Sequence, residues 1–255
     1  MGVGTITLHN NDTANFNVYS IKELQVIIDH CVKYPLITQK HSDFLLFKQA
    51  FEIIQRGDHL TEKGLLEIVG LKSALNLGLS EKLRAAFLNF VSITRPAFKF
   101  NGIPDPFWVA GFISGDGSFY LSIRSKISPT STTGNILRSV SLIFGVTLHL
   151  RDKEVIQALA SYFTLLNGKG FDSLTVKPYP ISVTKHSVSL YIRRFSEIVN
   201  VIIPFFDKHP ILGVKSLDFS DIKKVAEIVQ NKGHLTSSGF ESIQKINSTL
   251  NLRRP

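Results

Sequence analysis

The residues best suited to chemistry lie in one short segment, Trp108-Val-Ala-Gly-Phe-Ile-Ser-Gly-Asp-Gly-Ser-Phe119. Its pattern predicts an apolar helix that ends in a Gly-Asp-Gly-Ser turn and leads into a strand. Asp116 would lie at the helix C-terminus, where the helix dipole disfavours a carboxylate. A bound cation would relieve that conflict. A buried helix with a glycine C-cap is the alternative explanation of the same turn.

The same predicted helix carries small residues where a partner could approach closely. Gly111 and Gly115 are four residues apart, and Ala110 and Ser114 lie beside them. Residues four apart share one helix face, so this face would have almost no side-chain atoms. We therefore predict that Ala110, Gly111, Ser114 and Gly115 pack against another backbone.

Polar and apolar residues alternate after the turn. Phe119, Leu121 and Ile123 are the apolar members of a strand that starts at Ser118. Because successive side chains of a strand point to opposite faces, the polar members would share one face of a sheet. Later strands continue this face, whose predicted members are Ser118, Tyr120, Ser122, Arg124, Ser139, Ser141, Gly145, Ser189, Tyr191 and Arg193.

The charge of the chain is unevenly distributed. Its formal net charge is +9. Residues 1 to 105 carry 11 Lys/Arg against 10 Asp/Glu, whereas residues 118 to 194 carry 10 against 3. The excess therefore falls on the predicted sheet and favours a polyanionic partner, with a solvated basic face as the alternative.

Two features of the composition exclude other classes of protein. Cys31 is the only cysteine, which rules out an internal disulfide framework and a cysteine-based zinc site. No apolar run approaches the roughly 18 residues that a membrane-spanning helix needs. We therefore expect no membrane partner.

The elements around the motif form an internal duplication. Shifting the chain by 175 residues aligns Ser20–Asn76 with Phe195–Asn251 without a gap and gives 20 identities in 57 positions. Each copy predicts three helices with apolar stripes that would form core. The second helix of the first copy has Phe44, Phe47 and Phe51 in its stripe, and the third has Leu65 and Ile68.

The duplication sets the predicted domain boundaries. Residues 106–255 would form a complete second repeat, with residues 80–105 as a linker and residues 1–79 as the later part of a first repeat. Two strands near the N-terminus would match a hairpin made by Gly170–Val176 and Ser187–Arg193. On this interpretation the sequence starts inside a repeat, and the first motif helix is absent from it.

These features resemble the LAGLIDADG homing endonucleases of the single-chain, two-repeat type. Trp108–Phe119 looks like the second LAGLIDADG helix, and the runs Pro35–Lys40 and Ile211–Lys215 are similar to fungal mitochondrial members. The similarity covers essentially the whole chain. It implies an α+β fold of tandem αββαββα repeats, a monomer in the intact family member, and saddle-shaped antiparallel sheets that lie in the major groove of double-stranded DNA.

The resemblance also implies a reaction and its residues. The chain would be a site-specific DNA endonuclease that hydrolyses phosphodiesters with a divalent metal such as Mg²⁺. Asp116 would be the metal ligand, with the Gly115 carbonyl nearby. Lys40 and Lys215, which match across the repeat, would be the basic residues of two catalytic pockets. A solvated charge at a helix end is the alternative for each lysine.

The polar sheet residues of the second repeat would contact base edges, because mixed donors and acceptors can read the major groove. The matching hairpin of the first copy offers Thr5, Thr7, His9, Asn15 and Asn17. Plain solvent exposure is the alternative for any one of these residues.

Two departures from the family pattern matter for activity. One metal-binding carboxylate is absent with the first motif helix, and Leu148 stands where family members place a glutamine near the attacking water. We therefore expect impaired cleavage by this chain. An intron maturase that binds group I intron RNA and a non-catalytic DNA-binding remnant are the alternatives. The fungal resemblance implies a mitochondrial location.

Overall fold

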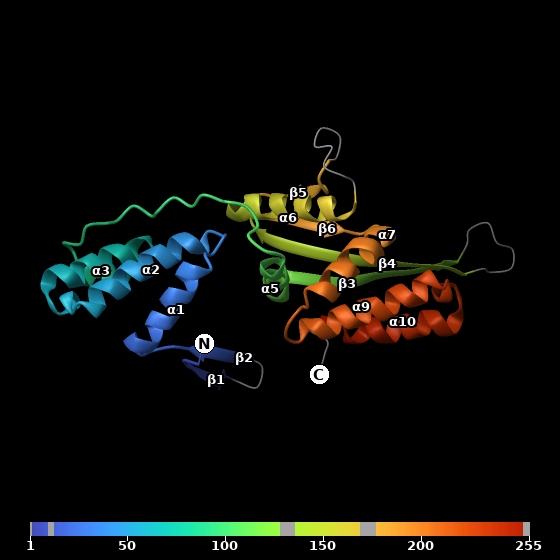
Figure 1. The fold of residues 1–255 in the computed structure, drawn as a ribbon, viewed down its shortest axis with the longest axis horizontal. Coiled ribbons are helices and arrows are strands. Elements are labelled where there is room, and N and C mark those ends of the chain that lie inside the picture. Colours follow the sequence, from blue (N-terminus) through green and yellow to red (C-terminus); the bar gives the residue numbers. More distant parts are fainter. Residues whose placement is uncertain (1, 10–12, 128–135, 169–176, 252–255) are drawn as a thin grey trace. The chain divides into compact units, whose positions relative to one another are not determined.

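The computed structural model describes residues 2–9, 13–127, 136–168 and 177–251 (Figure 1). The chain divides into two compact units, Met1–Phe100 and Asn101–Pro255, which we call unit 1 and unit 2. No helix among the described residues combines the length and apolar character needed to cross a membrane.

Unit 2 contains a four-stranded antiparallel sheet in the order β3-β4-β6-β5. Helices α6, α9 and α10 lie along this sheet (Figure 1). The element order confirms the predicted αββαββα unit. Its members are α5 (Pro106–Asp116), β3 (Gly117–Ile127), β4 (Ile136–His149), η3 (Leu150–Asp152), α6 (Lys153–Leu166), β5 (Ile181–Val183), β6 (Ser187–Ile192), α7 (Phe195–Glu197), η4 (Ile198–Ile202), α8 (Ile203–Lys208), α9 (Lys215–Gln230), η5 (Gly233–Leu235) and α10 (Ser237–Thr249).

A cluster of phenylalanines forms the core of unit 2. Phe119 of β3 pairs with Phe144 of β4, and both rings are almost fully buried. The ring of Phe119 contacts Phe206 of α8 and Phe219 of α9, while Phe144 contacts Phe163 of α6. Because Phe119 and Phe144 share one face of the sheet, α6, α8 and α9 cover that face. The opposite face is left for the polar residues.

Unit 1 repeats the last three helices of unit 2. Its elements are β1 (Thr5–His9), β2 (Thr13–Asn17), α1 (Ile21–Lys33), α2 (Lys40–Gln55), η2 (Asp58–Leu60), α3 (Glu62–Ala74) and α4 (Glu81–Ala86). α2, η2 and α3 match α9, η5 and α10 with an offset of 175 residues at both ends. Thr61 and Thr236 cap the last helix of each copy by accepting the backbone N–H of Gly64 and Gly239. The structure therefore confirms the duplication.

The first helix of the duplicated region differs between the copies. α1 is a regular α-helix of 13 residues, whereas the matching stretch Phe195–Lys208 passes through a π-helical segment, η4. Pro204 is the second residue after η4 and has no backbone N–H to donate to the preceding turn. Prolines and π-helical segments are both recognised sites of irregularity in a helix, and this stretch contains the two close together.

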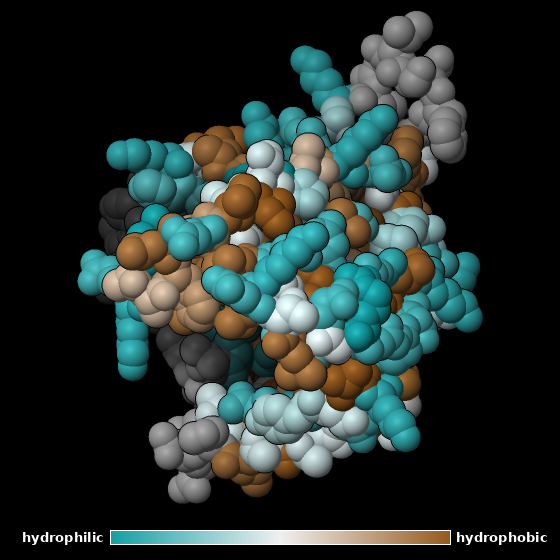
Figure 2. Space-filling view, turned by 90° about the vertical axis from the view of Figure 1, so that its left-hand side faces the viewer, coloured by the Kyte–Doolittle hydropathy of each residue, from teal (hydrophilic) through white to brown (hydrophobic). Residues whose placement is uncertain are grey.

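Part of the predicted core of unit 1 is exposed. Phe47 and Leu65 are 41% and 40% exposed, whereas their counterparts Ile222 and Phe240 in unit 2 are 2% and 6% exposed. Their prediction as core is therefore wrong for unit 1. The physical reason is that β3 and β4 pack on α9 and β3 packs on α10, whereas the two described strands of unit 1 show no comparable packing on α2 or α3. Figure 2, seen from the side of α2 and α3, shows apolar residues interspersed among hydrophilic ones.

The segment predicted as a linker contains one short helix and packs on unit 1 over part of its length. It contains α4, capped by the side chain of Ser80, and then packs against α2 and α3. Ile93 joins the apolar cluster of Leu46, Ile53 and Leu71. The contact boundary between the units falls after Phe100, so residues 81–100 belong to unit 1.

The predicted hairpin of the second copy falls only partly on described residues. Its predicted first strand, Gly170–Val176, lies outside the described residues. Its predicted second strand contains β6, which pairs with β5, with Val183 opposite Val188. The backbone N–H of Thr184 donates to the carbonyl of Ser187 and closes a short turn. The pairing is therefore only three residues long.

Candidate nucleic-acid interface and metal-binding site

Helix α5 delivers Asp116 to the start of β3. Its first turn is fixed by Asp105, whose carboxylate accepts the backbone N–H of Phe107 at 2.7 Å, and by Pro106 in the first helical turn. Val109 and Ile113 are fully buried and anchor the helix in unit 2. Asp116 is the last helical residue and is exposed. The sheet thus begins directly after an accessible carboxylate.

Lys215 lies beside Asp116 in the fold, although the two are far apart in the sequence. The Lys215 ammonium donates to the carbonyl of Gly117, the residue that follows Asp116. The Ser114 hydroxyl accepts the backbone N–H of Leu212 at 3.0 Å and donates to the Ala110 carbonyl at 2.7 Å. One bond thus joins the loop before α9 to α5, and a second joins the first residue of α9 to the first residue of β3, which places a cation next to the end of α5.

The small residues of α5 fall into two groups. Ala110 is buried within unit 2, and Ser114 is half-buried and bonded to Leu212. Gly111 and Gly115 are exposed, and a Cβ added at either position would meet no atom within 4 Å among the described residues. Trp108 and Phe112, whose rings stack at 4.8 Å, lie one turn apart on the same helix. Of the four small residues, Gly111 and Gly115 are therefore the two at which the backbone of α5 is accessible to another segment.

The register of unit 2 brings the predicted polar residues of β3, β4 and β6 to one face. Residues directly opposite in antiparallel strands point to the same side. The rows are Ser118–Gly145–Tyr191, Tyr120–Ile143, Ser122–Ser141 and Arg124–Ser139, and Thr147–Ser189–Ser182 adds a further row. Arg193 follows the end of β6 with the same alternation and is exposed. Thr147 and Ser182 were missed by sequence analysis, although Thr147 continues the alternation of β4.

Hydroxyl groups connect the part of this face that lies nearest Asp116. Thr147 Oγ1 lies 2.8 Å from Ser189 Oγ and 3.4 Å from the Tyr191 hydroxyl. The rings of Tyr120 and Tyr191 meet edge to face at 6.4 Å, and the Arg193 guanidinium lies 5.0 Å from the Tyr191 ring. Burial raises the pKa of Tyr120 to about 12, whereas the hydrogen bond with Thr147 is the main cause that lowers the pKa of Tyr191. These side chains form a connected set that we call the tyrosine cluster.

Gly145 makes the tyrosine cluster possible. A Cβ at this position would lie 2.9 Å from two ring atoms of Tyr191 and 3.2 Å from the Tyr120 hydroxyl. Any larger residue would push the Tyr191 ring away from the strand. The glycine therefore has a packing role, beyond its membership of the polar face.

Leu148 lies on the other side of the sheet. It pairs with Val188, which is fully buried, and is itself half-buried. The alternation of β4 thus puts Leu148 on the helix-covered face, and Thr147 on the polar one. His149, the last residue of β4, accepts the backbone N–H of Arg151 at 3.2 Å through Nδ1.

The hairpin of unit 1 also separates polar from apolar side chains. Its pairs are Thr5–Asn17, Thr7–Asn15 and His9–Thr13, and the Asn17 amide donates to the Thr7 hydroxyl at 3.0 Å. Ile6 and Leu8 on the opposite face are 73% and 83% exposed. Thr5, Thr7, Asn15 and Asn17 therefore share one face, as the polar residues do in unit 2.

Lys40 starts α2 in unit 1, where its counterpart in unit 2 is Lys215 at the start of α9. The Lys40 ammonium lies 3.9 Å from the Asp43 carboxylate and is exposed. Asp43 also pairs with Arg95, which donates to the carbonyls of Ala74 and Gln39. Lys40 therefore lies at the edge of a network that holds unit 1 together.

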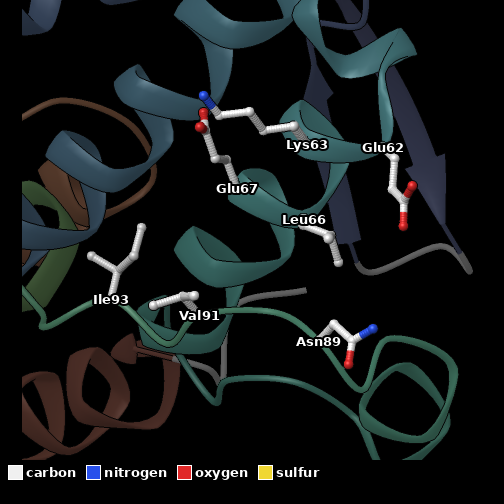
Figure 3. A pocket seen from close by; sticks show the side chains of 7 residues that line it. All are labelled: Glu62, Lys63, Leu66, Glu67, Asn89, Val91 and Ile93. Atoms are coloured by element: carbon white, nitrogen blue, oxygen red, sulfur yellow. The ribbon is translucent and has the colours of Figure 1, made fainter.

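The described residues contain no cluster of three or more His, Cys, Asp or Glu side chains that could hold a metal. A pocket of about 590 Å³ lies between α3 and the segment Asn89–Ile93 of unit 1 (Figure 3). Figure 3 shows its lining, which includes Leu66, Val91 and Ile93 and none of the predicted site residues. The exposed Asp116 thus remains the candidate ligand, and a metal there would need oxygen ligands other than the carboxylates of the described residues.

Known proteins similar to this chain share its architecture. The family model described as LAGLIDADG endonuclease matches residues 1–51 and 109–226. "Probable intron-encoded endonuclease 3" of Neurospora crassa is 36% identical over 95% of this chain and 43% of its own length. "Probable intron-encoded endonuclease 2" of the same fungus is 28% identical over 95% of this chain and 51% of its own length. The chain thus spans about half the length of these curated relatives.

Solved structures show the same similarity. The LAGLIDADG meganuclease I-CpaMI, bound to uncleaved DNA, is 44% identical with a TM-score of 0.86 over 98% of this chain and 81% of that one. I-GzeII, a LAGLIDADG homing endonuclease in complex with its DNA target, is 33% identical with a TM-score of 0.84 over 99% of this chain and 81% of that one. Together with the matching family model and the αββαββα unit, these similarities establish that the chain belongs to the LAGLIDADG endonuclease family.

Proposed function

We propose that this chain acts in site-specific cleavage of double-stranded DNA, with the polar sheet face of unit 2 in the major groove. The observation that carries the proposal is the strand register, which places the polar residues of three strands on one face of the sheet. The first residue of that face, Ser118, lies two residues after the exposed Asp116. The similar solved proteins I-CpaMI and I-GzeII are bound to DNA, which supports a duplex partner here.

The chemistry of the face fits this role. Its donors and acceptors are mixed, which suits the hydrogen-bonding pattern that base pairs present in the major groove. Arg124 and Arg193 are exposed at its borders and can reach phosphates or guanines. The excess of Lys/Arg over Asp/Glu in residues 118–194 adds a long-range electrostatic attraction to DNA. We assign base contacts to this face and to the polar face of the hairpin in unit 1.

The residues at the end of α5 suit a magnesium ion. Mg²⁺ usually binds through one or two carboxylates together with water and substrate phosphates. Asp116 offers an exposed carboxylate, and the Gly115 carbonyl is the neighbouring oxygen. When bound, the ion would activate a water molecule and stabilise the charge on the leaving oxygen. Asp116 would hold it, and the sheet would fix the position of the phosphate.

Lys215 completes the proposed site. Its ammonium is held at the Gly117 carbonyl, so the positive charge lies beside the site without being paired to a carboxylate among the described contacts. A fixed cation at this place can stabilise the phosphate charge as it increases during cleavage. We propose the corresponding role for Lys40 in the other catalytic pocket.

The relatives support a proposal for the location and the partner. One similar protein is the mitochondrial protein RF1 of Saccharomyces cerevisiae, 26% identical over 87% of this chain. We therefore propose a mitochondrial origin. Duplex DNA is the partner that the site supports best, and no observation here favours intron RNA over it.

The test is a cleavage assay on duplexes selected for binding. The 255 residues of the sequence contain one carboxylate at the end of a motif-type helix, Asp116, and the family resemblance implies one such carboxylate for each of the two cut strands. We expect the expressed chain to bind its selected duplex without making double-strand breaks. Adding a polypeptide that supplies a second motif helix should give Mg²⁺-dependent cleavage that Asp116→Asn abolishes. Double-strand breaks that persist in the Asp116→Asn variant would overturn the assignment of the metal ligand.

A matched control separates binding from chemistry. Asp116→Asn preserves the size of the side chain and should leave DNA affinity within about twofold, because it touches no described base-facing residue. Asp105→Asn changes a carboxylate at the other end of the same helix and should keep the cleavage activity. Loss of activity in both variants would indicate that helix α5 was damaged as a whole.

A further inference from the structure

The β3–β4 hairpin continues beyond the four-stranded part of the sheet of unit 2. β6 pairs with β4 from Phe144 to His149, and the earlier residues of β4 pair, among the described strands, with β3 alone. Pairing in this extension, which we call the ribbon, reaches Ile127 and Ile136. A two-stranded ribbon is barely stable by itself in water. Something must hold it if its outer residues are to occupy fixed positions.

Arg138 provides that support from the helix side. Its position in β4 alternates with Ser139 and Ser141, so it lies on the opposite face to them. Its guanidinium donates to the carbonyl of Leu235 at 3.0 Å and to the hydroxyl of Ser237 at 3.1 Å, and it lies 5.5 Å from the ring of Phe240. One side chain thus joins the ribbon to η5 and to the first turn of α10.

The point of attachment lies next to the outermost described row of the polar face. Ser139 follows Arg138 and pairs with Arg124 of β3. Arg124 is seven residues beyond Gly117, which at about 3.3 Å per residue is about 23 Å along the strand. At about 3.4 Å per base pair this corresponds to about seven base pairs from the end of α5. The Arg124–Ser139 row would therefore read bases far from the cleavage position.

We propose that Arg138 is a positioning residue that fixes the ribbon and so sets sequence preference at base pairs about seven positions from the scissile phosphate. This inference rests on the proposed function. Arg138 acts through the ribbon and does not itself lie on the DNA-facing side. The tyrosine cluster lies in the four-stranded part, where β6 supports β4, so preference nearer to Asp116 does not depend on Arg138.

The test measures equilibrium affinity for duplexes that differ from the selected site at single base pairs. In the Arg138→Ala variant, discrimination at the distal positions should fall from about tenfold to less than about threefold. Discrimination near the cleavage position should be unchanged. Arg151→Ala removes the same charge from an arginine that pairs with Asp152 outside the ribbon, and it should keep the full profile. Arg138→Lys retains the charge without the two-pronged contact, and we expect it to recover discrimination only in part.

Two outcomes would overturn the proposal. If Arg138→Ala weakens binding equally for all sequences and reduces the salt dependence by about one charge, Arg138 contacts phosphate directly. Discrimination equal to that of the wild type at every position would refute the role altogether.

A second measurement does not depend on DNA. Hydrogen exchange of the free chain should be about tenfold faster in Arg138→Ala at ribbon residues 122–126 and 137–141, and unchanged at residues 144–149. If the wild-type chain shows no sequence preference but this exchange pattern appears, the proposed function fails while the support by Arg138 stands. Unchanged exchange in the ribbon would contradict the support itself.

Discussion

Substituting Gly145 by alanine tests how the tyrosine cluster is built. The added Cβ would lie 2.9 Å from two ring atoms of Tyr191, well inside van der Waals contact. Extra volume in a packed site usually costs about 1–3 kcal/mol. Replacing glycine by alanine also recovers about 0.4–1 kcal/mol from the unfolded chain. Because Tyr191 is half-buried and can move toward solvent, we expect a net loss of about 1 kcal/mol.

Denaturant unfolding of the free chain measures this loss as a lower midpoint with an unchanged slope. The double variant Gly145→Ala/Tyr191→Ala lacks the clashing ring. Its loss of unfolding free energy should therefore be smaller than the sum of the losses in the two single variants. Base preference should relax next to the cleavage position, where Thr147 and Ser189 contact Tyr191. Gly111→Ala is the matched control, because its Cβ meets no described atom within 4 Å and alanine favours a helix. Equal stability and unchanged base preference in Gly145→Ala would refute the packing argument.

Three further predictions concern charge. Burial alone would raise the pKa of Asp43, but hydrogen bonds from Arg95 and the Asn76 N–H, with the charges of Arg95 and Lys40, lower it overall. A lowered pKa contributes stability at pH values above the unfolded pKa of about 4, and this stability is lost as the pH falls through the folded pKa. Acid unfolding of unit 1 should therefore begin as the pH falls through the folded pKa of Asp43. The dependence of stability on pH should be less steep in the Asp43→Asn variant. Arg95→Ala should cost about 1–2 kcal/mol of unfolding free energy in thermal or denaturant melts, because three acceptors lose their donor. Affinity for duplex DNA should fall steeply with salt, with a smaller slope in Arg193→Ala, and a flat response in binding titrations would remove DNA as the partner.

Sequence reasoning predicted the parts of the fold that have a clear period or a repeat. The offset of 175 residues located α9 and α10 from α2 and α3, and alternation identified the faces of β3 and β4. The helix α6 was not singled out from its residues, because its apolar positions follow a strand that is itself apolar. Exposure was the least predictable property. Phe47 and Leu65 have the same pattern as their buried counterparts, and only the number of strands packed on them differs.

The candidate site was predictable in its residues and less so in its connections. The Gly-Asp-Gly turn identified Asp116, and the repeat identified Lys215, but no local pattern shows that Lys215 reaches the carbonyl of Gly117. The contact of Arg138 with Ser237 joins residues 99 positions apart, so it depends on the tertiary fold alone. The small residues of α5 illustrate the same limit, since only packing distinguishes the buried Ala110 from the open Gly111.

Selection from a library of randomised duplexes, at low and at physiological salt, tests the central claim most directly. If the polar face of unit 2 reads DNA, the sequences bound by the chain should share preferred bases over a stretch of about six base pairs, the length that Ser118–Arg124 spans at about 3.3 Å per residue. Arg124→Ala should remove the preference at one end of that stretch and leave the rest. A bound pool indistinguishable from the starting library, or an unaltered preference in Arg124→Ala, would contradict the account.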